Sequence, residues 1–183
     1  MGGGVATNFK PMNAKAIYER YCPVGGKILD YSAGYGGRML GALSSKNGYL
    51  YAGIEPNTET FKNLKVLRNH ICKAINVQQV RLINGCSEDE IKKINYKFDF
   101  AFSSPPYFNL EHYCDEGTQS HLKNTTLNSW FESYVIPTIS AIYERLNDDC
   151  LFAVNIADYN YKGKKVEIVQ RWIDEAIKTG FEF

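Results

Sequence analysis

The chain has 183 residues, of which 44% are hydrophobic and 22% are charged. These proportions are ordinary for one globular domain with a proper core, and they exclude intrinsic disorder. A formal net charge of +1 excludes a strongly basic surface that coats nucleic acid, but it leaves room for a local basic groove.

Hydropathy and cysteine usage both indicate a cytoplasmic protein with no membrane contact. No apolar run approaches transmembrane length, and no charged-then-apolar leader is present. His112 and His121 flank a cysteine but lack a recognised ligand spacing, so we expect no metal site. The cysteines are odd in number and form no C-x-x-C pair, which is typical of free thiols in a reducing compartment: Cys22, Cys72, Cys86, Cys114 and Cys150.

The amino-terminal part reads as helix, strand, glycine turn and helix. Apolar spacing predicts a helix over 13–21, and Lys27–Asp30 reads as a short strand. The turn over 31–37 contains three glycines and opens a helix over 38–44. Glycine permits a tight turn and the close approach of a ligand, and the helix offers free N–H groups. This turn is therefore a candidate ligand site.

The second predicted strand, over 49–54, ends in a carboxylate. Asn57 is placed to cap a helix over 58–71. A carboxylate at the end of the second strand of a doubly wound sheet can accept both hydroxyls of a ribose. Glu55 is therefore a candidate nucleoside ligand. After a third strand, Val80–Asn84, Ser87 and Glu90 fit a capping box.

The fourth predicted strand leads into the most specific stretch of the chain. Three phenylalanines alternate over 98–102 and indicate a buried strand, which stops at Ser-Ser-Pro-Pro over 103–106. Two consecutive prolines donate no backbone hydrogen bonds and hold the chain extended, so nearby carbonyl oxygens stay unpaired. With the Ser104 hydroxyl and the ring of Tyr107 or Phe108, these oxygens can hold a planar ring that carries an amino group.

The carboxyl-terminal part begins with a long polar segment over 109–126. Such segments are usually functional, so we expect it on the substrate side. Alternating strands and helices predict an α/β fold, a Rossmann-like doubly wound, mostly parallel sheet with helices on both faces. The remaining elements are expected in this order: a helix from Leu127 that Pro137 kinks, a strand over 150–156, a helix over 166–178 and the opening of another strand over 181–183.

Two stretches resemble motifs of one family. Ser104-Pro105-Pro106-Tyr107 is similar to the (D/N/S)-P-P-(Y/F) motif of S-adenosylmethionine-dependent methyltransferases that modify exocyclic amino groups, chiefly adenine-N6 and cytosine-N4 of DNA. The D-x-x-x-G-x-G-G pattern from Asp30 to Gly37 resembles the first motif of the same enzymes, where the loop lies under the methionine part of the cofactor. The glycine spacing differs from the dinucleotide fingerprint.

The resemblance implies a class I methyltransferase fold and a set of site residues. It implies S-adenosylmethionine as cofactor and S-adenosylhomocysteine as product. The catalytic residues implied are Ser104, Pro105, Pro106 and Tyr107. The cofactor-binding residues implied are Phe9, Pro11, Asp30, Ser32, Ala33, Gly34, Gly36, Glu55, Pro56, Cys86, Ser87 and Glu88.

The resemblance also implies where the domain ends and which partners it has. We expect one methyltransferase domain over 1–183 that stops short of the family's antiparallel sixth and seventh strands. DNA is the expected partner and RNA the second, and a partner chain or a missing carboxyl-terminal segment would supply target recognition. Motif order resembles the adenine class, whereas serine in first position is commonest among cytosine-N4 enzymes, so the target atom stays open.

Three alternatives accompany this interpretation. Transfer to RNA or to a protein glutamine is the rival reaction, and serine in place of asparagine weakens the glutamine version. A non-catalytic cofactor-binding or DNA-docking subunit is the rival outside enzymes. A cytosine-C5 mechanism is disfavoured, because it needs a cysteine after a proline and no cysteine here follows one.

Overall fold

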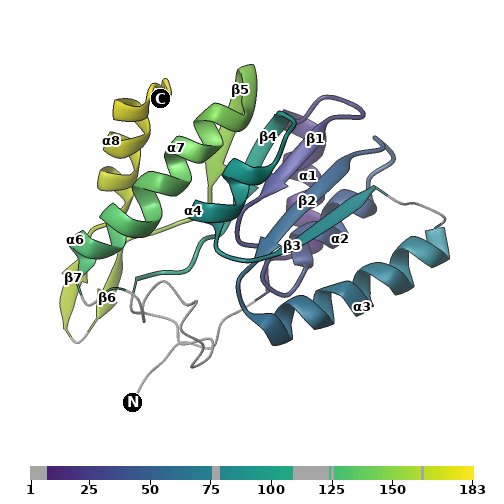
Figure 1. Cartoon of the computed structure of the whole chain (residues 1–183), viewed down its shortest axis with the longest axis horizontal. Coiled ribbons are helices and arrows are strands. Elements are labelled where there is room, and N and C mark those ends of the chain that lie inside the picture. Colours follow the sequence, from purple (N-terminus) through teal and green to yellow (C-terminus); the bar gives the residue numbers. More distant parts are fainter. Residues whose placement is uncertain (1–7, 76–78, 109–123, 125, 162) are drawn as a thin grey trace.

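The computed structural model describes residues 8–75, 79–108, 124, 126–161 and 163–183. Its centre is a five-stranded parallel sheet in the order β3-β2-β1-β4-β5 (Figure 1). The strands are β1 (Lys27–Asp30), β2 (Leu50–Glu55), β3 (Val80–Asn84), β4 (Phe98–Ser103) and β5 (Leu146–Val154). The predicted doubly wound α/β fold is therefore confirmed.

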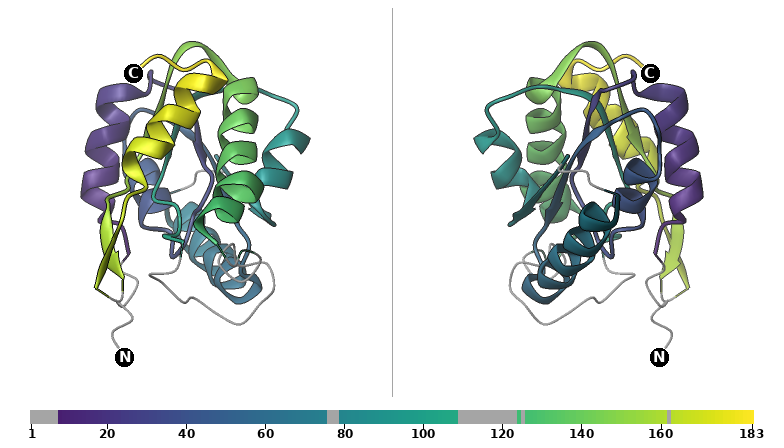
Figure 2. Two further views of the ribbon diagram at one scale, coloured as in Figure 1. Left: turned by 90° about the vertical axis from the view of Figure 1, so that its left-hand side faces the viewer. Right: turned by 90° about the vertical axis from the view of Figure 1, so that its right-hand side faces the viewer.

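Helices cover both faces of the sheet, as the edge-on views of Figure 2 show. One face carries α1 (Pro11–Tyr21), α2 (Gly37–Leu43) and α3 (Thr58–Ile75). The other face carries the short α4 (Ser87–Glu90) and η1 (Ile91–Lys93), then α6 (Leu127–Trp130), the π-helical η2 (Phe131–Val135) and α7 (Ile136–Arg145), with α8 (Val169–Thr179) beside α7. No helix within the described residues combines the length and apolar character needed to cross a bilayer.

Aromatic side chains fill the core on both sides of the sheet. Phe100 and Phe102 point from β4 toward α1, where Tyr18 packs edge-on against both rings at 6.1 and 6.0 Å. Ala101 faces the opposite layer, as the period of two requires. Phe98 packs in that layer too, because the pairing of β4 with β5 shifts register between Phe98 and Phe100. β4 thus supplies apolar side chains to both faces of the sheet and is buried as predicted.

The distortion expected at Pro137 takes the form of the π-helical turn η2, which immediately precedes α7. Proline at the start of α7 donates no backbone N–H, so the preceding turn widens without losing a further bond. The continuous helix expected from Leu127 is thus divided into α6, η2 and α7.

Two expectations for the carboxyl-terminal part are wrong. Residues 181–183 do not form a strand, because Gly180 turns with φ 123° and Phe181 donates its N–H back to the Ala176 carbonyl. Between β5 and α8 the chain forms an unpredicted antiparallel hairpin, β6 (Tyr159–Tyr161) and β7 (Lys164–Val166), so α8 begins at Val169 and not at 166.

Candidate functional site

The glycine turn after β1 is held by backbone contacts to β2. Ala33 donates to the Ile54 carbonyl at 2.8 Å, and Gly34 and Gly36 adopt φ values of 55° and 85°, which favour glycine. A Cβ at Gly34 would have no non-adjacent neighbour nearer than the Ser32 carbonyl oxygen, at 4.0 Å. The space over Gly34 is therefore open, as a ligand that lies along the backbone requires.

Asp30 is the fully buried anchor of this turn. Its Oδ1 accepts from Ser32 N at 3.3 Å and Ser103 Oγ at 2.7 Å, and its Oδ2 accepts from Arg38 Nε at 2.9 Å and Tyr51 Oη at 2.5 Å. Burial, followed by the charge of Asp30, raises the pKa of Tyr51, so this phenol remains an O–H donor at neutral pH. Asp30 therefore joins the ends of β1 and β4, and its carboxylate oxygens accept hydrogen bonds from groups of the protein itself.

The segment before α1 lies against the start of α2. Asn8 Oδ1 accepts from Gly37 N at 3.1 Å, and the Phe9 ring packs edge-on against Phe102 at 5.4 Å with the Arg38 guanidinium 5.7 Å above it. A side chain at Gly37 would collide with the Phe9 carbonyl and the Asn8 side chain. Phe9 is thus brought to the glycine turn, and Pro11, two residues later, opens α1.

Glu55 at the end of β2 faces the same turn. Its Oε2 accepts from Gly34 N at 2.9 Å and its Oε1 accepts from Asn57 N at 2.9 Å, and burial raises the pKa of the carboxyl. A carboxylate offers about four lone-pair sites, so roughly two remain for a ligand. Asn57 caps α3 as predicted, because its Oδ1 accepts from Thr60 N at 2.7 Å.

The turn after β3 joins the same edge of the sheet, with a corrected role for Ser87. The predicted capping box is wrong, because the N-cap position is Cys86 and no side chain caps α4. Ser87 Oγ instead donates to the Tyr31 carbonyl, which ties this turn to the glycine turn. Ligand atoms of Cys86, Glu88 and Asp89 lie within 4.8 Å of one another, and Asp89 is the exposed member of the three.

The two serines at the end of β4 lie in different environments. Ser103 is fully buried and bonds Asp30, whereas Ser104 is half-buried and pairs with Asn155, which follows β5. Ser104 Oγ donates to the Asn155 carbonyl and accepts from Asn155 Nδ2, both at 3.2 Å, while Asn155 N donates to the Ser103 carbonyl at 2.9 Å. One lone pair of the Ser104 hydroxyl remains for an outside donor.

Tyr107 and Phe108 also differ in burial. Phe108 is 8% exposed and packs against Trp130 at 6.1 Å, so the expectation that its ring could stack on a base is wrong. The half-buried Tyr107 packs edge-on against Tyr159 of the hairpin at 5.4 Å. Pro105 is buried and Pro106 half-buried between the two serines and this tyrosine. Of the two rings, Tyr107 is the more exposed.

Several residues at the site escaped prediction from the sequence. Tyr134 of η2 reaches the glycine turn, where its buried hydroxyl lies 3.3 Å from Ser32 Oγ and burial raises its pKa. Asn8, Arg38 and Asn155 match no motif, and their hydrogen bonds become visible only in the folded structure. Most of the predicted substrate segment 109–126 lies outside the described residues; Thr126 caps α6.

The chain is similar in structure to several solved methyltransferases. Against a TehB-like SAM-dependent methyltransferase from Corynebacterium glutamicum the TM-score is 0.58 at 13% identity, covering 96% of this chain and 74% of that one. Against a methyltransferase from Pyrococcus furiosus it is 0.60 at 18% identity, covering 94% and 73%. Against an rRNA methylase from Streptococcus thermophilus it is 0.52 at 10% identity, covering 81% and 72%.

These likenesses show the fold. The five-stranded parallel sheet flanked by helices is the Rossmann-like fold of class I methyltransferases. No protein-family model matches the sequence, and no curated protein matches it either.

Proposed function

We propose that the protein transfers a methyl group from S-adenosylmethionine to an exocyclic amino nitrogen of a base in nucleic acid, with DNA as the first substrate. One observation carries the proposal. The glycine turn after β1 and the Ser-Pro-Pro-Tyr stretch after β4 lie on neighbouring strands at the same edge of the sheet and share the Asp30–Ser103 hydrogen bond. That edge, at a topological switch point, is where open α/β sheets bind ligands.

The residues at this edge suit S-adenosylmethionine. The open space over Gly34 accepts the methionine part, beside Ser32, Ala33 and Gly36, and Phe9 and Pro11 approach from the preceding segment. Glu55 has acceptor capacity for the ribose hydroxyls, with Pro56 next to it, and Cys86 to Glu88 would border the adenine. In this assignment Asp30 acts indirectly, since it shapes the turn.

The bound cofactor supplies an activated methyl group, so the protein mainly has to orient the acceptor and exclude water. Ser104 Oγ, steadied by Asn155, accepts one hydrogen of the base amino group through its remaining lone pair, and the Pro105 carbonyl accepts the other. Both acceptors stabilise the positive charge that develops on the nitrogen. Serine is no base at neutral pH, so the proton leaves to solvent.

Tyr107 gives the flipped base a new stacking partner. An extruded base loses a few kcal/mol of stacking and pairing, which an aromatic side chain partly restores. The Tyr107 ring is supported by Tyr159 at 5.4 Å and does not depend on Phe108, which belongs to the core. RNA remains the second substrate, and the similarity to an rRNA methylase favours keeping it in the test.

Radiolabelled methyl transfer to unmodified DNA, RNA and protein pools tests the proposal. We expect label on nucleic acid with the parent protein, at least tenfold less with Ser104→Ala or Tyr107→Ala, and no change with Ser140→Ala, a half-buried serine on α7. Label on protein alone would overturn the proposal in favour of a glutamine substrate. Cofactor binding without any transfer would favour a docking subunit.

A further inference from the structure

One part of the sheet has much less helical cover than the rest. On the α3 side, an 18-residue helix spans β2 and β3, whereas the crossover from β3 to β4 carries only the four residues of α4 and the three of η1. Parallel sheets are normally covered on both faces. Here the amino-terminal halves of β2 and β3 stay open on the α4 side, and Leu50 is 40% exposed.

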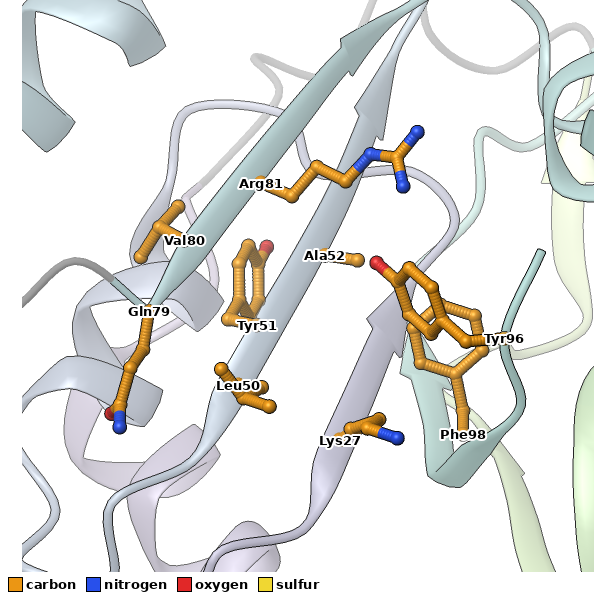
Figure 3. Close-up of a pocket in the computed structure, with 9 residues that line it drawn as sticks. All are labelled: Lys27, Leu50, Tyr51, Ala52, Gln79, Val80, Arg81, Tyr96 and Phe98. Carbon is orange, nitrogen blue, oxygen red and sulfur yellow. The ribbon is translucent and has the colours of Figure 1, made fainter. Parts of the chain in front are cut away.

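A cavity of about 410 Å³ occupies this open face (Figure 3). Its lining includes the first residue of each of four strands, Lys27, Leu50, Val80 and Phe98. The strands are parallel, so the cavity lies at the edge opposite Gly34 and Ser104 and is separate from the proposed methyl-transfer site. Its volume falls in the range of small-molecule sites, about 300–1,000 Å³.

Charge and aromatic surface coincide in this cavity. The Lys27 ammonium and the Arg81 guanidinium each lie 5.7 Å from the centre of the Tyr96 ring. Figure 3 shows the two cations toward opposite ends of the cavity. In the described part of the chain neither cation has an ion-pair partner. The nine lining residues include no carboxylate. The neighbouring Asp99 is engaged by the Lys27 backbone N–H and the Asn147 amide.

We propose that this cavity binds a small aromatic anion, a flat ring that carries a carboxylate or a phosphate. The ring packs on the floor formed by Leu50 and Ala52 and against Tyr96, and the positive charges of Lys27 and Arg81 on either side attract the anionic group. A guanidinium fork suits carboxylate and phosphate oxygens geometrically, and an ammonium adds a compact positive charge. The charge complementarity selects this occupant over a neutral apolar one.

Calorimetric titration with matched pairs of probes tests the proposal. One pair is 2-naphthoate and the neutral 2-naphthalenemethanol, and the other is adenosine monophosphate and adenosine. We expect at least one anion to bind tenfold or more tightly than its neutral partner, which corresponds to about 1.4 kcal/mol. Binding of the naphthoate alone identifies a carboxylate ligand, and binding of the nucleotide identifies a phosphate ligand.

Variants locate the binding. Lys27→Gln and Arg81→Gln should each weaken the anion about tenfold, whereas Lys46→Gln, which removes an exposed lysine elsewhere, should leave affinity unchanged. Equal affinity for charged and neutral partners, anion binding that persists in the Lys27→Gln/Arg81→Gln double variant, or no binding of either anion would each overturn the proposal. So would a dimer in solution that these variants dissociate, since the face would then be an interface between copies.

Discussion

The Asp30 carboxylate accepts four hydrogen bonds, from a backbone N–H, a serine, a tyrosine and an arginine. Both partners of its ion pair with Arg38 are buried, since the Arg38 side chain is 6% exposed and the Asp30 side chain 0%. A buried ion pair adds little over a well-packed apolar pair, but loss of one partner leaves an uncompensated charge. Asp30 is thus more important for folding than its place in a ligand motif suggests.

Asp30→Asn should therefore lower the free energy of unfolding by about 3–5 kcal/mol, because Arg38 loses its counter-ion in the interior. Urea unfolding measures the change. The double variant Asp30→Asn/Arg38→Met should be less destabilised than the single one, and Asp148→Asn, at the exposed pair with Lys97, should have no measurable effect. Equal midpoints for Asp30→Asn and the parent would contradict the anchor role.

Asn155→Ala should reduce kcat about tenfold or more and change KM much less. The Ser104 hydroxyl loses its Nδ2 partner and rotates more freely, so its lone pair meets the amino group less often. Asn155→Asp, which keeps the size but loses the donor, should resemble Asn155→Ala. Steady-state methyl transfer measures both, with Asn95→Ala, an exposed asparagine, as control. A loss confined to KM would contradict positioning of the acceptor.

Burial raises the pKa of Glu55 above its ordinary value of 4.5. As pH falls, this carboxyl gains its proton earlier than an exposed glutamate and loses acceptor strength toward ribose hydroxyls. S-adenosylhomocysteine affinity, titrated from pH 8 to pH 5, should fall through the raised pKa. Glu55→Gln should bind weakly at every pH, and Glu59→Gln should keep the parent profile.

The pH dependence of folding stability has the opposite sign to that of binding. The contribution of Glu55 to the free energy of unfolding is full below pH 4.5 and is lost as pH rises through the raised pKa.

How far the sequence predicts single residues depends on where their partners lie. The position of Glu55 at a strand end, the helix cap at Asn57 and the burial of β4 were predictable, because strand ends, caps and apolar runs leave local patterns. Arg38 and Asn155 were not, since neither belongs to a recognisable motif and only the folded structure shows their hydrogen bonds to Asp30 and Ser104. The Ser87 error has the same origin, because Tyr31 offered its carbonyl from 56 residues away.

At the scale of elements, the close crossing of α1 and α2 aligns the segment before α1 with the glycine turn. Gly41 lies at the crossing, where a Cβ would come within 2.6 Å of Ala14 Cβ and 2.7 Å of the Pro11 carbonyl oxygen. Such contacts require one helix to move. The position of Phe9 beside the glycine turn therefore depends on the close approach of the two helices at Gly41.

Gly41→Ala should destabilise the protein by about 1–3 kcal/mol through overpacking and should also weaken S-adenosylhomocysteine binding. Thermal unfolding and calorimetry measure the two effects. Ala16→Ser adds an atom to the exposed face of α1 and should alter neither. An unchanged melting temperature for Gly41→Ala would show that the helices can separate without strain.

Elements were predictable where an apolar run or a helical periodicity stands out between turn residues. The ranges of β1 and β3 agree at both ends, and α3 extends four residues beyond the expected end. The hairpin β6–β7 was missed because each strand has three residues, too few for alternation to register. Its Asp158 accepts from the N–H groups of Ile168 and Val169, so the hairpin and the start of α8 fix each other.

At the scale of the whole molecule, the sheet separates two edges with different chemistry. The carboxyl ends of the strands gather the glycine turn, Glu55 and Ser104, and the amino ends carry the cavity around Tyr96. The alternation of strands and helices made this topology predictable, because parallel strands must be joined by crossovers. The open face of the sheet on the α4 side was not predictable, because the sequence does not indicate which strands the four-residue helix α4 leaves uncovered.

Mass analysis of nucleosides tests the central claim most directly. Unmodified DNA and RNA are incubated with S-adenosylmethionine and the parent protein or Ser104→Ala, digested and analysed. The account predicts N6-methyladenine or N4-methylcytosine from the parent and at least tenfold less from Ser104→Ala. Methylation of carbon 5 of cytosine or of a ribose hydroxyl would contradict it, and so would equal product from both proteins.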